Sequence, residues 1–204
     1  LGACALAFLL AHLWALPPAL EDPDSINFAL AVEKFDVAKH QPHPPGYPLY
    51  VAVTKTSTAL VGALKPDWDR DRRAAAGLSI VSATAGALAA GIVTAFWLAL
   101  GFPNRLAILS TVLTLTSPLF WITATRPLTD VAGLTAALAV LTLLIRGWRS
   151  VRQGEERMPG AWIAAALGTG LVPGLRSQTI WLVGPLVGWV VWEMASQRRW
   201  RHLA

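Results

Sequence analysis

Hydrophobic and polar positions divide the chain into long apolar segments separated by short polar ones. About 20 consecutive apolar residues cross the hydrocarbon core of a bilayer as a helix, so such segments predict membrane spans. Leu1–Leu16 is apolar except for His12 and stops at Pro17-Pro18. We read it as the end of a membrane helix whose start precedes this sequence, which makes the chain a fragment of a longer one. Further apolar segments occupy 74–100, 106–122, 128–145, 161–175 and 179–195. The pattern predicts an all-α, polytopic transmembrane helical bundle that forms one domain over residues 1–204.

The region 20–73 has a different pattern. Asp22 is a suitable helix cap and Pro23 suits the first helical position. Phe28, Val32 and Phe35 follow at i, i+4 and i+7, which predicts a short amphipathic helix on the membrane surface. A second helical segment, 49–64, carries Lys55 near its middle, and a central lysine costs about 2.5–3.5 kcal/mol on insertion. We therefore expect two juxtamembrane helices in one polar loop, and we expect 49–64 not to span.

A proline-rich stretch, HQPHPPGYPLY at 40–50, lies between these two helical segments. Each proline fixes φ, removes an N–H group and biases the preceding residue toward extended geometry. The stretch is therefore predicted to be a rigid, mostly extended loop that presents His43 and Tyr47 at fixed positions.

Composition supports the membrane assignment and narrows the class of partner. The chain is 54% hydrophobic and 14% charged, whereas soluble domains carry about 25% charged residues. The net charge of +5 is compatible with nucleic-acid binding, but the basic residues flank apolar segments and no basic-groove or stacking pattern occurs. We expect the lipid bilayer as a partner and no nucleic acid. The single cysteine, Cys4, excludes an intrachain disulfide.

Basic residues suggest how the chain is oriented. If the basic loop 146–157 and the basic tail 198–201 are cytoplasmic, parity places the polar breaks at 125–130 and 176–178 on the opposite face, together with the loop 20–73. The Lys/Arg count alone does not settle the orientation, because the outer pieces are as rich in these residues. This topology predicts that every candidate active residue lies on the extracytoplasmic face.

Four sequence pieces together resemble a known family. They are the acidic stretch 21–28 (EDPDSINF), the string PHPPGYPLY, the basic run Arg70–Arg73 and the segment 125–130 (TRPLTD). In this order they resemble the N-terminal half of GT-C glycosyltransferases, and HPPGYPLY is most similar to the branch related to protein O-mannosyltransferases. The resemblance implies a multi-pass enzyme of the bacterial plasma membrane. It also implies a polyprenyl-phosphate-linked sugar as donor, a mannose-like or other hexose, and a protein, lipid or glycan as acceptor.

The resemblance also implies a first-loop acid as general base, a loop that contacts the lipid phosphate and, in some members, a divalent cation. Asp24 matches that acid, since a small residue and then an aromatic one follow it. Glu21 and Asp22 are alternatives, and Asp22 is better explained as the cap. The structural alternative for Asp24 is a favourable interaction with the helix N-terminus.

The proline-rich stretch supplies candidate donor-binding groups. His43 can hydrogen-bond a phosphate or ligate a metal. His40 lies three residues earlier, but off a helix this spacing does not create a His-x-x-His site; it remains a candidate metal ligand. Tyr47 can contact phosphate or sugar, or can serve as an interfacial anchor.

Cations and one acid near the later polar breaks complete the candidate site. Arg126 and Asp130 are spaced i, i+4, and with Pro127 at the first helical position they are expected to share one helix face. They form either a functional pair or a structural ion pair, and Asp130 is also a candidate metal ligand. Charges near the membrane core indicate a functional site by default.

The turn at 176–178 supplies the strongest candidate phosphate ligand. Gly170–Gly174 (GLVPG) is expected to break the preceding helix and leave Arg176 below the outer surface. A guanidinium binds phosphate through two donors, so Arg176 is the predicted clamp, with Gln178 beside it and Lys55 a weaker candidate for the same task.

A second function fits part of the same pattern. A carrier or flippase that binds polyprenyl-phosphate lipids without chemistry also uses intramembrane charges and broken helices. An inverted repeat would favour the carrier, and the sequence contains none that we detect. An acidic loop confined to one face favours the enzyme.

Overall fold

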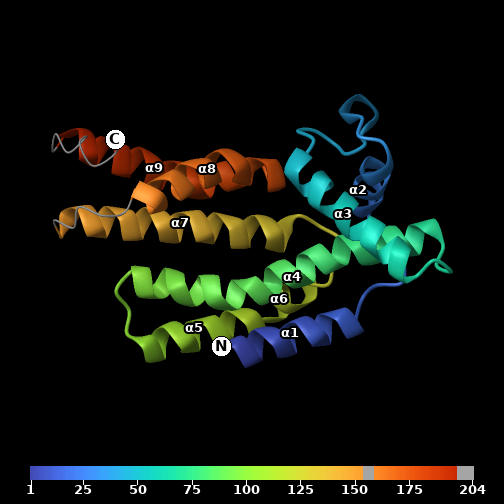
Figure 1. The fold of residues 1–204 in the computed structure, drawn as a ribbon, viewed down its shortest axis with the longest axis horizontal. Helices are drawn as coiled ribbons and strands as arrows, with labels where there is room; N and C mark the ends of the chain where they lie inside the picture. The colour runs from blue at the N-terminus through green and yellow to red at the C-terminus, as the bar shows by residue number, and fades with distance from the viewer. Residues whose placement is uncertain (154–158, 197–204) are drawn as a thin grey trace.

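The computed structural model describes residues 1–153 and 159–196, which are helical with no β-strand. This confirms the predicted all-helical class for the described part of the chain. The elements, shown in Figure 1, are α1 (Gly2–Trp14), α2 (Pro23–Glu33), a 3-10 turn (Val37–Lys39), α3 (Pro48–Leu64), α4 (Arg70–Ala99), α5 (Asn104–Thr116), α6 (Pro118–Thr123), α7 (Asp130–Arg152), α8 (Pro159–Leu175) and α9 (Thr179–Ser196).

Within the described residues, three helices are long and apolar enough to cross a membrane. They are α4, α7 and α9, with 30, 23 and 18 residues. The apolar helices α1 and α8 are shorter. The helix α3, at 48–64, has 17 residues and is not among the three, and the expectation that this segment does not span stays a prediction.

The predicted span at 106–122 is wrong as a single helix. It divides into α5 and α6 at Ser117-Pro118, where Ser117 is extended with φ −62° and ψ 136°. Proline disfavours helical geometry at the preceding residue and itself suits the first position of a new helix. The 13 residues of α5 rise only about 20 Å, short of the roughly 30 Å hydrocarbon core.

The predicted helix break at 170–174 is also wrong. The helix α8 continues through Pro173 and ends at Leu175. Arg176 is thus the first residue after an uninterrupted helix, and its backbone N–H still donates to the Val172 carbonyl at 3.1 Å.

Small residues let the neighbouring helices approach α4 closely. A Cβ added at Gly77 would lie 2.6 Å from the Thr58 Cα atom of α3. A Cβ at Gly86 would lie 2.6 Å from the ring of Phe8 in α1. Close backbone approach at glycine is the usual way in which membrane helices gain van der Waals contact. The helix α4 is therefore the element on which α1 and α3 pack.

The apolar face of α2 is covered by protein. Phe28 and Val32 are buried, and Phe28 packs with the fully buried Tyr50 of α3 and Leu78 of α4. Phe35 lies beyond the end of α2 and is half exposed. The predicted stripe of Phe28, Val32 and Phe35 on a membrane-surface helix is therefore wrong at Phe35, and the remainder of that face contacts the bundle.

The region 20–73 gathers at one end of the bundle. In Figure 1, α2, α3 and the proline-rich loop lie where α4 and α7 begin and α8 ends. The C-terminal ends of α4 and α7 lie at the opposite end, with Arg149 and Arg152. Both ends of the region 20–73 therefore lie at one end of the bundle, and its side of the membrane stays a prediction. The other basic residues on which the predicted orientation depends, Arg157 and those at 198–201, lie outside the described residues.

Candidate functional site

The N-terminus of α2 holds the three acidic candidates in different environments. The Asp22 carboxylate accepts a hydrogen bond from the Ser25 N–H at 2.9 Å, and the Asp22 N–H donates to the Ser25 hydroxyl at 3.3 Å. This capping box confirms the predicted cap, with Pro23 at the first helical position. Asp24 lies in the first turn with its side chain 59% exposed, and Glu21 precedes the helix and is exposed. Asp24 is therefore the acid that is both fixed by a helix and open to a substrate.

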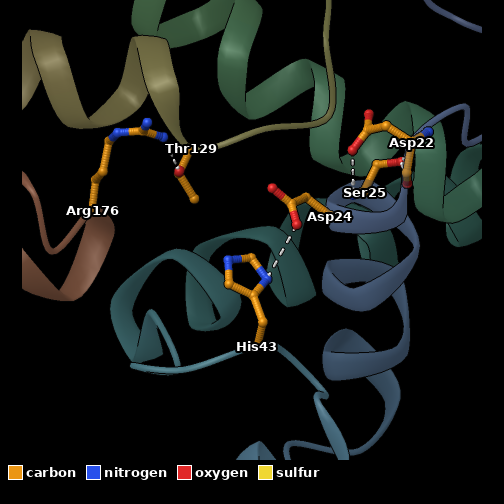
Figure 2. A network of polar contacts seen from close by, with 6 residues as sticks. All are labelled: Asp22, Asp24, Ser25, His43, Thr129 and Arg176. Carbon is orange, nitrogen blue, oxygen red and sulfur yellow. Dashed lines mark hydrogen bonds and ion pairs between the residues drawn. The ribbon is translucent and has the colours of Figure 1, made fainter.

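Asp24 faces His43. The Nδ1 atom of His43 lies 3.5 Å from the Asp24 Oδ1 atom, as Figure 2 shows. The imidazole packs against Phe28 and Tyr47, with ring centroids 5.4 and 5.1 Å away. The structure therefore brings together the two residues that the sequence selected from the acidic stretch and from the proline-rich loop.

The loop that carries His43 is folded rather than extended. Asp36 pairs with Gln41 across a short turn, and the Gly46 N–H donates to the His43 carbonyl at 3.1 Å. Tyr47 then takes a left-handed conformation, with φ 45°, before α3 begins. The prediction of a mostly extended loop is wrong, because local hydrogen bonds close the chain into turns between its prolines.

The other candidates from this region lie in different places. Tyr47 is 5% exposed, and its ring contacts Phe28 and His43 edge-on, so in this structure it supports the imidazole. His40 is exposed at the turn, in a left-handed conformation with φ 57°. Lys55 is exposed on α3, two turns from its start. Of these three residues, only Tyr47 contacts His43.

A second polar cluster joins α7 to the turn after α8. The Arg176 Nη2 atom lies 2.9 Å from the Asp130 Oδ1 atom, and its Nη1 donates to the Thr129 hydroxyl at 2.8 Å. The aliphatic stem of Arg176 crosses Gly133, where an added Cβ would lie 2.6 Å from the Arg176 Cβ. Gly133 therefore creates the space through which Arg176 reaches Thr129 and Asp130.

The predicted pairing of Arg126 with Asp130 on one helix face is wrong. The helix α7 begins at Asp130, and residues 124–129 form turns and bends. Arg126 lies in this non-helical segment and is exposed. Asp130 instead pairs with Arg176, so an ion pair is present but its cation comes from another part of the chain.

Tyr50 is a central residue that the sequence analysis did not select. It is fully buried, and its hydroxyl lies near that of Ser82, which donates to the Leu128 carbonyl at 2.9 Å. Burial raises the pKa of the Tyr50 phenol, and the negative charges of Asp130 and then Asp22 raise it further. Tyr50 therefore lies near both acids. A signal was available, since Tyr50, Thr54 and Val61 share one face of a helix that starts at Pro48.

An apolar groove of about 640 Å³ leads away from the Arg176–Asp130 pair. Gln178, Thr179 and Thr123 line its polar part. Its apolar walls come from α6, α7 and α9, namely Leu119, Phe120, Val131, Leu134, Trp181 and Leu182. Leu119 and Trp181 are both 80% exposed at its edge. An apolar chain with an anionic head group matches this arrangement, because the head can reach Arg176 while the chain stays among aliphatic and aromatic side chains.

The predicted metal ligands, Asp130 and His40, lie on different elements of the fold. In the described residues, no three His, Cys, Asp or Glu side chains gather as a metal-binding group. The Asp130 carboxylate already contacts Arg176, and His40 is exposed on its turn. A divalent cation stays a prediction, and the chemistry below is derived from the described side chains alone.

Comparisons of the chain with protein families, with curated proteins and with solved structures give no match.

Proposed function

We propose that this chain belongs to a membrane glycosyltransferase with a GT-C-like bundle, which moves a sugar from a polyprenyl-phosphate donor to an acceptor hydroxyl on the extracytoplasmic face. One observation carries the proposal. Arg176 lines an apolar groove, and the exposed acid Asp24 lies on α2 at the same end of the bundle (Figure 1 and Figure 2). In this proposal Arg176 binds the phosphate and the groove holds the first isoprene units. Asp24 accepts the proton of the acceptor hydroxyl.

The reaction requires one proton acceptor and one phosphate ligand. The acceptor oxygen forms a bond to the anomeric carbon while the bond from that carbon to the phosphate oxygen breaks, and its electron pair leaves with polyprenyl phosphate. The hydroxyl proton moves to the Asp24 carboxylate and then to solvent. Arg176 stabilises the charge on the leaving phosphate, and a polyprenyl phosphate needs no acid to depart. A single displacement of this kind inverts the anomeric centre.

The decisive experiment is a turnover assay of the protein in membranes, with a panel of polyprenyl-phosphate sugars and the Asp24→Asn variant beside the wild type. We expect release of polyprenyl phosphate with at least one donor and loss of that release in the variant. A wild-type protein that releases polyprenyl phosphate from no donor contradicts the proposal.

A lipid carrier is the second candidate, because the groove and Arg176 suffice to bind a polyprenyl phosphate without chemistry. It is favoured by the fact that Asp24 is not among the residues that line the groove. The two functions separate in the same assay. A carrier binds and moves the lipid without cleaving it, and it is insensitive to Asp24→Asn.

A further inference from the structure

We infer that His43 is a positioning residue for Asp24 and acts through its Nδ1 atom, rather than a direct ligand of the donor phosphate. The inference rests on the proposed function for its catalytic meaning. The pairing of the two side chains can be tested without any turnover.

The contact itself supports this role. The His43 Nδ1 atom is buried and has no hydrogen-bond partner in the described residues, and Asp24 Oδ1 lies 3.5 Å from it. An ionised carboxylate only accepts hydrogen bonds, so in this pair the hydrogen must reside on Nδ1. At 3.5 Å the contact is too long for a strong hydrogen bond, but contacts of catalytic groups are often long before substrate binds and shorten in the complex.

The surroundings hold the imidazole in this orientation. Phe28 and Tyr47 pack on the ring, and the Gly46 N–H bonds to the His43 carbonyl. A Cβ at Gly46 would lie 2.9 Å from Val37, so the turn itself is tightly packed. This packing holds the ring in place, whereas the Asp24 side chain is 59% exposed. A donor held in place beside an exposed carboxylate restricts the orientations of that carboxylate.

The position of Arg176 argues against His43 as the main phosphate ligand. Arg176 lines the apolar groove, and His43 does not. In Figure 2 one dashed line joins a ring nitrogen of His43 to Asp24, and a separate dashed line joins Arg176 to Thr129. We therefore assign His43 to the orientation of the proposed base and Arg176 to the binding of the lipid phosphate.

Two substitutions distinguish the role of the His43 Nδ1 atom from that of Nε2. In His43→Asn the amide nitrogen can take the place of Nδ1, whereas in His43→Gln it reaches the place of Nε2. We expect His43→Ala and His43→Gln to lower kcat by about 10- to 100-fold, the range found when the hydrogen-bonding partner that orients a metal ligand is lost, with the KM for the lipid donor unchanged. His43→Asn should retain most of the turnover. The inference is overturned if His43→Gln keeps its turnover and His43→Asn loses it, or if both variants lose turnover equally. It is also overturned if the main effect is a raised KM for the lipid donor.

A spectroscopic measurement tests the pairing when no turnover is available. The chain has four histidines, so 15N-histidine NMR of the protein in detergent can assign His43 with the His43→Asn variant. We expect neutral His43 to carry its hydrogen on Nδ1 in the wild type and to lose this preference in Asp24→Ala. His40→Asn is the matched control, since His40 is exposed and asparagine tolerates its left-handed conformation. A His43 tautomer that is unaffected by Asp24→Ala overturns the inference even if the transferase proposal stands. A correct tautomer without any glycosyl transfer overturns only the transferase proposal.

Discussion

Arg176, in the turn between α8 and α9, pairs with Asp130, the first residue of α7, with 2.9 Å between Nη2 and Oδ1. The Asp130 carboxylate also lies at a helix N-terminus, where the dipole favours negative charge. One carboxylate therefore occupies part of the guanidinium that the proposed lipid phosphate would bind. The ion pair orients Arg176 toward the groove and competes with the phosphate for its donors.

The first prediction concerns that competition. Asp130→Asn should strengthen binding of a polyprenyl phosphate by about fivefold, which corresponds to roughly 1 kcal/mol, the upper range for a partly exposed ion pair. Arg176→Ala should weaken both binding and turnover, and Arg176→Lys should restore them only in part, since a point charge replaces a two-donor fork. Titration of each variant with a fluorescent polyprenyl phosphate measures the change. Weaker binding in Asp130→Asn would mean that Asp130 orients Arg176 more than it competes for it.

The second prediction concerns the base. Asp24→Asn should lower turnover by about 10²–10⁴-fold while binding of the lipid donor stays nearly intact, because the amide keeps the size of the side chain but cannot accept the proton. Single-turnover kinetics and lipid titration separate the two effects. If Asp24→Asn stays active and Glu21→Gln or Asp22→Asn does not, the base lies in this loop but is not Asp24. If all three stay active, the carrier takes the place of the enzyme.

The third prediction uses the capping box. Asp22→Ala should lower the free energy of unfolding by about 1 kcal/mol, because the N–H of Ser25 loses its acceptor. Asp22→Asn should be close to wild type, since asparagine caps equally well. Thermal unfolding in detergent, together with hydrogen exchange at the first turn of α2, measures both. An equal loss in the two variants would assign the effect to charge rather than to the cap.

The fourth prediction uses the passage of Arg176 over Gly133. Gly133→Ala should displace Arg176, because the new Cβ would lie 2.6 Å from its Cβ and 3.0 Å from its Cδ. Binding of the lipid phosphate should weaken about as much as in Arg176→Ala. The control is Gly170→Ala in α8, where no atom lies within 4 Å of the added Cβ. That variant should bind lipid normally. If Gly133→Ala also binds normally, Arg176 reaches the phosphate by another path.

The fifth prediction tests the topology. Single cysteines at Asp36 and Asp67, introduced in a Cys4→Ala background, should react with a membrane-impermeant reagent from the same side. The reason is that 36–67 includes α3, which is not among the helices able to span. A cysteine at Arg105 provides the opposite-side reference, because it follows the long helix α4. Labelling of Asp36 and Asp67 from opposite faces would make α3 a span and would separate Asp24 from Arg176 across the membrane.

Local patterns in the sequence determined much of the helical framework. Asp22 caps the helix that begins at Pro23, because its side chain accepts a hydrogen bond from a free N–H group of the first turn. The long apolar run of α4 predicts a helix, because a segment in lipid must pair its backbone polar groups internally. These features depend on residues within one or two turns of each other. The sequence also singled out Asp24, His43 and Arg176, because rare polar residues stand out among apolar segments.

Tertiary structure alone decided which of these residues meet. Arg176 bonds Thr129 from 47 positions away, and its partner Asp130 was assigned by spacing to Arg126, which lies outside α7. Spacing predicts contacts only within a continuous helix, and the chain turns between 124 and 129. Pro118 and Pro173 also show that tertiary packing, and not the local sequence alone, decides the structure. Pro118 begins a new helix after an extended Ser117, whereas Pro173 is carried inside α8, where the neighbouring Gly174 packs closely on Leu49 of α3. A proline weakens a helix locally, but packing against other helices decides whether the helix ends there.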